Sequence, residues 1–209
     1  YTLNVLSTAL YDKPAFKDVK VSGLILAGDG KKMSKRLNNY TDPLELIEKY
    51  NSDILRLYLI SSPASKGDSF NFNDDDLGMI YKKMIPLHSA INMFNDYMVD
   101  IKNCLDIEPN LENLTRLDKY IVSKINEFKI KINEKLDNYD TFNLDSDILS
   151  MIDIICNLYI RLSRNRINGM SGRLKYYNTY MVFDYIINEF LETVKAILPL
   201  TFEKLSNKK

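Results

Sequence analysis

The stretch LILAGDGKKMSKR, residues 24–36, joins an apolar run to a basic turn. Residues 21–27 are predicted to form a buried strand of a parallel sheet, because strands covered on both faces are almost continuously hydrophobic. The Gly-Asp-Gly turn that follows leads to four cations within six residues, from Lys31 to Arg36. Lysine side chains there suit phosphate oxygens, because a compact charge on a flexible stem can follow a phosphate as it moves. The alternative is a solvated hairpin tip without a ligand.

Helices are predicted on both sides of this stretch. Residues 1–10, 43–50 and 52–60 should be helical. Asp42 is expected to cap the second of these helices, because it precedes a proline at the first helical position. Asn51 is expected to adopt a positive φ where that helix ends, since asparagine tolerates this conformation. Apolar residues recur at helical spacing in the same helix, at Leu44, Ile47 and Tyr50.

Beyond a polar, glycine-containing boundary at residues 66–76, the pattern becomes continuously helical, apart from a loop expected at 103–114. Four apolar stripes recur in steps of three and four, as one face of a helix requires. Their members are Ile80, Met84, Leu87, Ile91, Phe94 and Met98; Ile121, Ile125, Phe128, Ile132 and Leu136; Met151, Ile152, Ile155, Leu158, Tyr159 and Leu162; and Phe183, Ile187, Phe190, Leu191, Val194, Ile197 and Leu198. Such stripes joined by polar loops predict an antiparallel bundle and a mainly α fold.

The composition limits the classes of function. With 209 residues, of which 45% are hydrophobic, the chain can bury a core in one or two domains. The formal net charge is zero, so a nucleic-acid surface has to be a local patch. One histidine and two distant cysteines, Cys104 and Cys156, offer no zinc-ligand spacing, and Cys156 is expected to be a core thiol. No segment resembles a signal peptide or a membrane span, which favours a cytoplasmic protein.

The third predicted bundle helix has an informative polar face. Five of its residues fall together opposite the apolar stripe: Asn157, Arg161, Arg164, Asn165 and Asn168. No acidic residue occurs from 154 to 183, a stretch whose cations also include Arg166, Arg173 and Lys175. Arginine and amide groups suit phosphates and base edges, and Tyr176 and Tyr177 are expected to stack on unpaired bases. The alternative is a solvated helix face.

Residues 32–36, Lys-Met-Ser-Lys-Arg, resemble the Lys-Met-Ser-Lys-Ser signature of class I aminoacyl-tRNA synthetases. The similarity continues through residues 37–43 and 49–63. It takes the form typical of isoleucyl-tRNA synthetases of the eukaryotic cytosolic type, in which arginine commonly ends the signature and an Asn-Tyr pair follows.

The resemblance extends into the predicted bundle. Residues 157–166 are similar to the family's Asn-Trp-Tyr-Ile-Arg segment and the arginine run after it. Leu158 replaces the usual tryptophan, and Asn165 interrupts the arginine run. Residues 118–123 and 198–202 resemble landmarks of the family's anticodon-binding domain.

The resemblance implies a C-terminal fragment, cut from a longer cytoplasmic isoleucyl-tRNA synthetase. Residues 1–41 would end a Rossmann-type α/β catalytic domain, residues 42–76 would form a connecting unit, and residues 77–209 would form the anticodon-binding bundle. The parent enzyme would attach isoleucine to its tRNA through an adenylate made from ATP. Its partners would be isoleucine tRNA and the remainder of the synthetase chain, with no membrane. Membership of a multi-synthetase assembly is left open.

The resemblance also implies roles for individual residues. Lys32 and Lys35 would hold the phosphates of ATP, which the parent uses with magnesium. Met33 would lie near the adenine, and Ser34 and Arg36 would shape the loop. The residues expected to bind tRNA are Arg161, Arg164, Arg166, Asn157 and Asn165, with Arg166 turning toward the apolar side if the helix continues that far. The fragment would hold no zinc site and, without the amino-acid pocket, would be inactive alone.

Two other functions fit the residues. The first is a non-catalytic RNA-binding helical module whose lysine-rich turn matches by accident. The second is a helical protein-interaction scaffold, in which the arginine face docks an acidic partner. Preference for RNA over acidic protein and steep salt dependence would separate the two.

Overall fold

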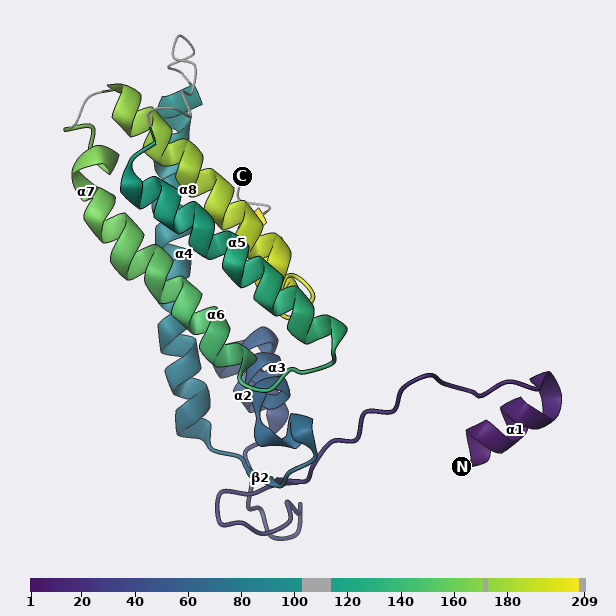
Figure 1. Ribbon diagram of the computed structural model, residues 1–209. Helices are drawn as coiled ribbons and strands as arrows, with labels where there is room; N and C mark the ends of the chain where they lie inside the picture. Colours follow the sequence, from purple (N-terminus) through teal and green to yellow (C-terminus); the bar gives the residue numbers. More distant parts are fainter. Residues whose placement is uncertain (103–113, 171–172, 207–209) are drawn as a thin grey trace.

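The computed structural model describes residues 1–102, 114–170 and 173–206. A helical bundle stands on a small unit of short helices and strands, and an N-terminal helix extends away from both (Figure 1). In chain order the elements are α1 Thr2–Tyr11, β1 Ile25–Leu26, α2 Pro43–Tyr50, α3 Ser52–Ser61, a 3-10 turn η1 Pro63–Lys66, β2 Phe70–Asn71, α4 Asp74–Lys102, α5 Arg116–Asp137, α6 Leu144–Asp153, a π-helical segment η3 Ile154–Ile160, α7 Arg161–Ile167, α8 Arg173–Val194 and α9 Pro199–Ser206.

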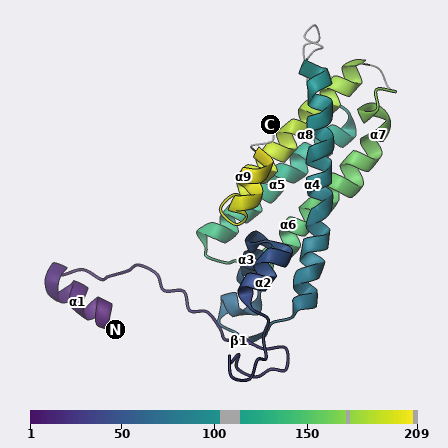
Figure 2. The same cartoon turned by 180° about the vertical axis from the view of Figure 1, so that it is seen from behind.

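The bundle is built from α4, α5, α8 and the continuous rod formed by α6, η3 and α7. The chain direction alternates from one of these to the next (Figures 1 and 2). Most of the predicted stripe residues are buried, namely Ile80, Met84, Leu87, Ile91 and Phe94 of α4, Ile121, Ile125, Phe128 and Ile132 of α5, and Phe183, Ile187, Phe190, Leu191 and Val194 of α8. The side chain of Met98 lies outside the described part. The prediction of a mainly α fold is confirmed.

Aromatic rings fasten the bundle helices to each other. Phe128 of α5 stacks on Phe190 of α8, with ring centroids 5.6 Å apart. Phe94 of α4 contacts Tyr180 and Phe183 of α8, at centroid distances of 5.6 and 4.9 Å. Such ring pairs contribute about 0.5–1.5 kcal/mol each beyond the area they bury, so α8 is held from both sides.

The connecting unit packs α2 and α3 against the start of α4. Asp42 caps α2 as predicted, its carboxylate accepting the Leu44 N–H at 2.8 Å. Asn51 has the predicted positive φ, 82°, and its side chain also accepts the Asp53 N–H that opens α3. The predicted apolar face of α2 is wrong, because Leu46 is the buried residue while Leu44 is 69% exposed. Tyr50 is half-buried, with its ring centroid 5.7 Å from that of Tyr81 in α4, whereas Leu44 and Ile47 face solvent.

The strand prediction holds in direction and fails in extent and burial. β1 pairs in parallel with β2, with Ile25 opposite Phe70, but it contains only two residues. Of the predicted segment 21–27, only Ala27 is buried, and Leu24 is 66% exposed. Tyr58 of α3 packs on Phe70 of β2, with ring centroids 5.3 Å apart, whereas Leu24 and Ile25 on the β1 side remain exposed. β2 was not foreseen, since two residues in a polar stretch carry no alternation.

The N-terminal helix α1 makes no packed contact with the bundle (Figure 1), and none of its residues is buried. Its apolar side chains are therefore displayed to solvent in this chain. Among the helices in the described part of the chain, none has the length and apolarity needed to cross a membrane.

Candidate nucleotide and nucleic-acid sites

The basic loop leaves β1 through a tight turn. The Gly30 N–H donates to the Ala27 carbonyl at 2.8 Å, and the Ala27 N–H donates to the Lys31 carbonyl at 2.9 Å. Gly30 adopts φ 77°, a left-handed conformation that glycine reaches without strain. The turn therefore reverses the chain directly after the strand and directs the lysines outward.

The side chain of Asn39 holds the backbone of the basic loop in place. This role of Asn39 was not predicted from the sequence. Its side-chain oxygen accepts the Ser34 N–H at 2.9 Å, and its amide nitrogen donates to the Lys32 carbonyl at 3.3 Å. Thr41 then donates to the Asp74 carboxylate at 2.7 Å, which ties the end of the loop to the start of α4. An asparagine five residues past a serine gives no local signal, because its partners are backbone groups that only the folded loop brings near.

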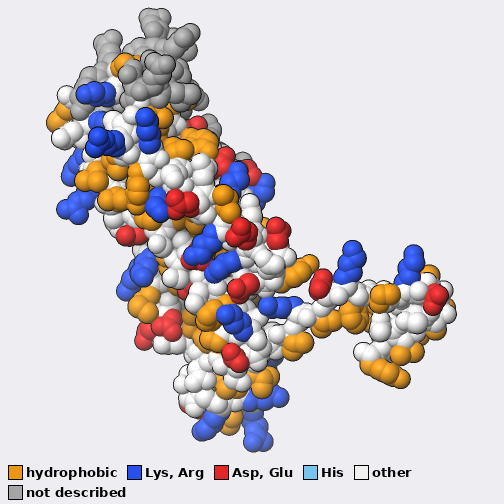
Figure 3. All heavy atoms as spheres, viewed as in Figure 1, with side chains coloured by type: hydrophobic (Ala, Val, Ile, Leu, Met, Phe, Trp, Pro, Cys, Tyr) orange, Lys and Arg blue, Asp and Glu red, His pale blue; other side chains and the backbone are white. Residues whose placement is uncertain are grey.

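The cations of the loop stand in solvent at the lower end of the molecule (Figure 3). Lys32, Lys35 and Arg36 are exposed, and within the described residues none of them is paired with a carboxylate. Lys31 lies 3.7 Å from Asp29, a solvent-screened contact. Met33 is half-buried beside a hollow of about 430 Å³, whose lining includes Gly28, Tyr40 and Phe72. The loop thus combines unpaired positive charge with an adjoining concave surface.

In the third bundle rod, the π-helical segment changes which residues face the core. The buried side chains fall at every fourth position, Ile155, Tyr159, Ser163 and Ile167. In an α-helix, residues four positions apart differ in direction by about 40°, so such a series would drift around the helix. The wider turns of a π-helical segment reduce this drift and keep the buried residues on one side of the rod. The prediction that Leu162 faces the core is consequently wrong, since this side chain is 61% exposed.

The polar face predicted for this rod is exposed to solvent. Its members are Asn157, Arg161, Arg164, Asn165 and Asn168. Asn157 donates to the Asp153 carboxylate one turn earlier at 2.5 Å, and neither arginine of the face has a carboxylate partner in the described part of the chain. The side chain of Arg173 lies outside that part. The face therefore offers two guanidinium groups and several amides without competing ion pairs.

Two predicted stacking residues turn out to be packed. Tyr176 and Tyr177 are half-buried against the core of the bundle. The Tyr176 ring contacts that of Tyr180, with centroids 4.8 Å apart. Because α8 uses this side to pack on α7 and α4, these rings are not free platforms for bases.

Arg166 differs from Arg161 and Arg164, because its guanidinium belongs to a buried polar cluster. Its Nη1 donates to both carboxylate oxygens of Asp118, at 2.9 and 2.8 Å, and its Nη2 donates to the Ser163 hydroxyl at 2.7 Å. Asp118 is 0% exposed and also accepts the Tyr159 hydroxyl at 2.9 Å. The helix continues to Ile167, so Arg166 turns toward the core as expected, with a side chain only 12% exposed.

The electrostatics of this cluster favour the ion pair. Burial opposes ionisation of Asp118, but hydrogen bonds from Arg166 and Thr115 outweigh it and lower the pKa of this carboxyl below its usual value. Burial, together with the Asp118 charge, raises the pKa of the Tyr159 hydroxyl, which stays a neutral donor. The result is a charged pair fully satisfied inside the bundle.

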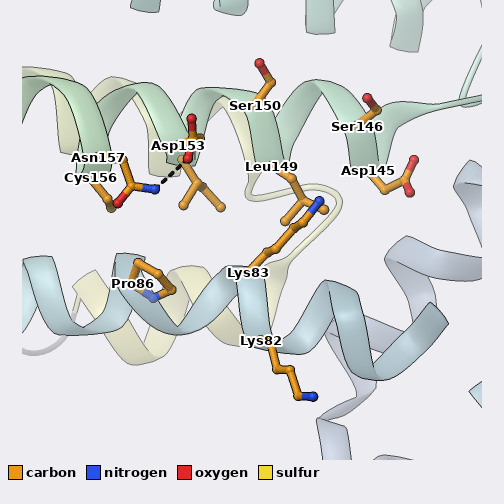
Figure 4. A pocket seen from close by; sticks show the side chains of 11 residues that line it. Lys82, Lys83, Pro86, Asp145, Ser146, Leu149, Ser150, Asp153, Cys156 and Asn157 are labelled. Carbon is orange, nitrogen blue, oxygen red and sulfur yellow. Dashed lines mark hydrogen bonds between the residues drawn. The ribbon is translucent and has the colours of Figure 1, made fainter. Parts of the chain in front are cut away.

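A groove of about 640 Å³ runs between α4 and α6 (Figure 4). Lys83 extends toward α6 while Lys82 points away, and Asp145 and Asp153 stand on the opposite wall (Figure 4). Burial raises the pKa of the Cys156 thiol to about 12, so the thiol is protonated. Cys156 was expected to be a core thiol, but it is only half-buried and lines the groove. The groove is lined by two lysines and two aspartates, so their charges cancel. Among the described residues, no cluster of His, Cys, Asp or Glu side chains is suited to hold a metal ion.

Comparisons with known proteins match both ends of the chain. Residues 1–71 match the family model of the class I tRNA synthetases (I, L, M and V), and residues 118–209 match that of the anticodon-binding domain of tRNA ligases. The chain is 33% identical over 208 residues to a cytoplasmic isoleucine–tRNA ligase of Arabidopsis thaliana, covering 96% of this chain and 17% of the relative. It is 36% identical over 177 residues to that of Caenorhabditis elegans, covering 82% and 16%.

Solved structures share the fold. The LeuRS of Agrobacterium radiobacter in a ternary complex with tRNA and LeuAMS is similar with a TM-score of 0.70 and 15% identity, over 99% of this chain and 24% of that one. The methionyl-tRNA synthetase of Mycobacterium tuberculosis bound by methionyl-adenylate has a TM-score of 0.69 and 17% identity, over 87% and 36%. The chain thus spans about a sixth of the length of its curated relatives.

Proposed function

Because this chain belongs to the isoleucine–tRNA ligases among the class I tRNA synthetases, we propose that it is a working part of a cytoplasmic enzyme that joins isoleucine to its tRNA. Residues 1–41 end the catalytic domain, residues 42–76 connect it to the bundle, and residues 77–209 bind the anticodon arm. One observation carries the proposal: two separate surfaces, the basic loop and the polar face of α7, present cations that no carboxylate neutralises within the described residues.

The proposed role of the basic loop is to bind ATP during amino-acid activation. The isoleucine carboxylate attacks the α-phosphate of ATP, and pyrophosphate leaves with its negative charge. Lys32 and Lys35 oppose that charge, while Met33, Ser34 and Arg36 shape the surface beside it. Such a preorganised electrostatic contact commonly contributes a factor of about 10²–10³ to the rate. Magnesium, brought in with ATP, would screen the charge of the phosphates.

The proposed role of the polar face is to hold isoleucine tRNA. Arg161 and Arg164 suit phosphates and guanine edges, and Asn157 and Asn165 suit base edges. Arg166 was also predicted to bind tRNA, but its guanidinium already satisfies Asp118, so we assign the direct contacts to the other four.

The test of the tRNA proposal is a salt series of binding isotherms. We would measure the affinity of the chain for isoleucine tRNA and for an anticodon-substituted form, with and without Arg161→Ala/Arg164→Ala. We expect the double substitution to weaken binding at least about tenfold and to lower the salt slope by about two, one per lost phosphate contact. Lys124→Ala/Lys129→Ala is the matched control, because it removes the same charge from α5, where both lysines pair with glutamates. Equal, weak binding by every form would refute the proposal.

The test of the basic loop uses the full-length enzyme. Lys32→Ala/Lys35→Ala should abolish ATP–pyrophosphate exchange while leaving the affinity for tRNA unchanged, because the loop lies at the far end of the molecule from α7 (Figure 1). A non-catalytic RNA-binding module, the second candidate, predicts no exchange in the unsubstituted enzyme. The 209-residue chain alone should show no exchange.

A further inference from the structure

We propose that Asn39 is a positioning residue, which holds Lys32 and Lys35 in a fixed arrangement for the phosphates of ATP. The inference rests on the proposed function of the basic loop, and it names the side chain that gives this loop its shape. The observation behind it is that one amide contacts the backbone on both sides of Met33. Its oxygen accepts the Ser34 N–H at 2.9 Å, and its nitrogen donates to the Lys32 carbonyl at 3.3 Å.

The backbone of Lys32 is held from two sides. Lys32 faces Leu26 of β1 in an antiparallel bridge. A hydrogen bond of this pairing is made by the neighbouring residues, from the Ala27 N–H to the Lys31 carbonyl at 2.9 Å. In such a pair the N–H and C=O groups of the two facing residues point away from the partner segment. The Lys32 carbonyl therefore points away from β1, and Asn39 donates to it there.

The turn that carries Lys35 is closed by the same side chain. The Leu37 N–H donates to the Ser34 carbonyl at 3.1 Å. The next hydrogen bond runs from the Asn38 N–H to the Lys35 carbonyl, at 3.3 Å. Asn38 has a φ of 46°, so the chain reverses there and brings Asn39 back to the Ser34 N–H. Asn39 therefore joins the two ends of this turn, and the direction in which Lys35 extends depends on it.

Asn39 is itself anchored outside the basic loop. Two residues later, the Thr41 hydroxyl donates at 2.7 Å to the carboxylate of Asp74, the first residue of α4. An asparagine amide fits both backbone partners, because its oxygen accepts from Ser34 while its nitrogen donates to Lys32. The anchor at α4 limits the movement of this amide, so the loop is held against a fixed point.

Loss of the Asn39 amide should affect the chemical step more than ATP binding. Lysine stems are long and flexible, so released lysines still attract the phosphates. Stabilising the departing pyrophosphate, in contrast, requires positive groups that are in place before the charge develops. A neutral hydrogen bond shifts a local equilibrium by about twofold to tenfold, so losing two should raise the open population of the loop about tenfold.

The first experiment measures the shape of the loop without ATP. We would follow amide hydrogen exchange at Leu37 by NMR in the unsubstituted chain and in Asn39→Ala. The Leu37 N–H is the informative group, because it donates to Ser34 within the turn rather than to Asn39. We expect exchange at Leu37 to be about tenfold faster in Asn39→Ala, since exchange reports the population of the locally open form. An unchanged rate would overturn the proposal.

Two further variants complete this experiment. Asn39→Asp keeps the shape of the side chain and an acceptor for the Ser34 N–H but loses the donor to Lys32, so it should speed exchange at Leu37 by a smaller factor. A rate as fast as that of Asn39→Ala would overturn the role given to the Ser34 bond. Asn138→Ala is the matched control, because its amide also donates to a backbone carbonyl, at 2.8 Å, but at the end of α5. It should leave exchange at Leu37 unchanged, and an equal acceleration would refute a specific role for Asn39.

The second experiment links the loop to catalysis in the full-length enzyme. Asn39→Ala should lower kcat for ATP–pyrophosphate exchange about tenfold and change KM for ATP less than about threefold. In a Lys35→Ala background the same substitution should cost less than about threefold, because a lysine that is absent cannot be misplaced. Equal losses in both backgrounds, or a loss confined to KM, would refute positioning. If Lys35→Ala by itself leaves the exchange reaction unchanged, the proposed function of the loop fails, and the amide exchange at Leu37 still decides whether Asn39 holds the turn.

Discussion

Asp53 joins the connecting unit to the C-terminal end of the bundle, and its removal is the sharpest stability test of the fold. The residue is 0% exposed in α3. Its Oδ2 accepts the Thr201 N–H at 2.6 Å, across 148 residues of chain, and its Oδ1 accepts the Arg56 guanidinium at 3.2 Å. The carboxylate therefore caps the N-terminal end of α9, where backbone N–H groups lack partners.

The expected magnitude follows from these contacts. A hydrogen bond to a charged group contributes about 1.5–3 kcal/mol, against about 0.5–1.5 kcal/mol for a neutral one. Asp53→Asn keeps the shape and one acceptor oxygen but removes the charge, so we expect the free energy of unfolding to fall by about 1–3 kcal/mol. Folded domains have about 5–15 kcal/mol in total, so the variant should remain folded and measurable.

The assay is urea unfolding of the variant and the parent chain, compared at equal slope. Lys124→Met is the matched control: its pair with Glu127 is exposed on both sides, so its loss should leave the free energy of unfolding nearly unchanged. A loss below about 0.5 kcal/mol for Asp53→Asn, or a loss equal to that of the control, would refute the reasoning that α9 depends on this carboxylate.

Three further predictions concern other parts of the chain. A β-carbon on Gly23 would lie 1.8 Å from a backbone carbonyl oxygen, so Gly23→Ala should unpair β1 from β2 and speed amide exchange at Phe70; an unchanged exchange rate would contradict this. Leu162→Ser should change the unfolding free energy by less than about 0.5 kcal/mol, whereas Ser163→Leu should lower it by about 1–3 kcal/mol, and the reverse order would exclude the π register. The lowered pKa of Asp118 means that its stabilisation is present above about pH 4 and is lost as pH falls through the folded value. The stability difference between the parent and Asp118→Asn should therefore shrink on acidification, and a pH-independent difference would contradict the linkage.

Much of this protein follows from its sequence. The stripes of α4, α5 and α8 were predictable because a helix repeats every 3.6 residues and a buried face repeats with it. The cap at Asp42 and the positive φ of Asn51 were also predictable, because both depend on residues next to them in the sequence. The exposure of Arg161 and Arg164 was also predictable, since both lie opposite the apolar residues of their helix.

Other features were decided by residues far apart in the chain. Tyr176 and Tyr177 are committed to packing because α8 meets its neighbours there. Ser163 is buried in place of Leu162 directly after the π-helical segment Ile154–Ile160, and its hydroxyl accepts a hydrogen bond from Arg166, the partner of Asp118. The apolar periodicity of a sequence reflects only residues within a few helical turns of each other. It therefore predicts that a leucine is buried in preference to the serine beside it. The tertiary structure reverses that order, because the wider turns of the π-helical segment shift the residues after it around the helix axis.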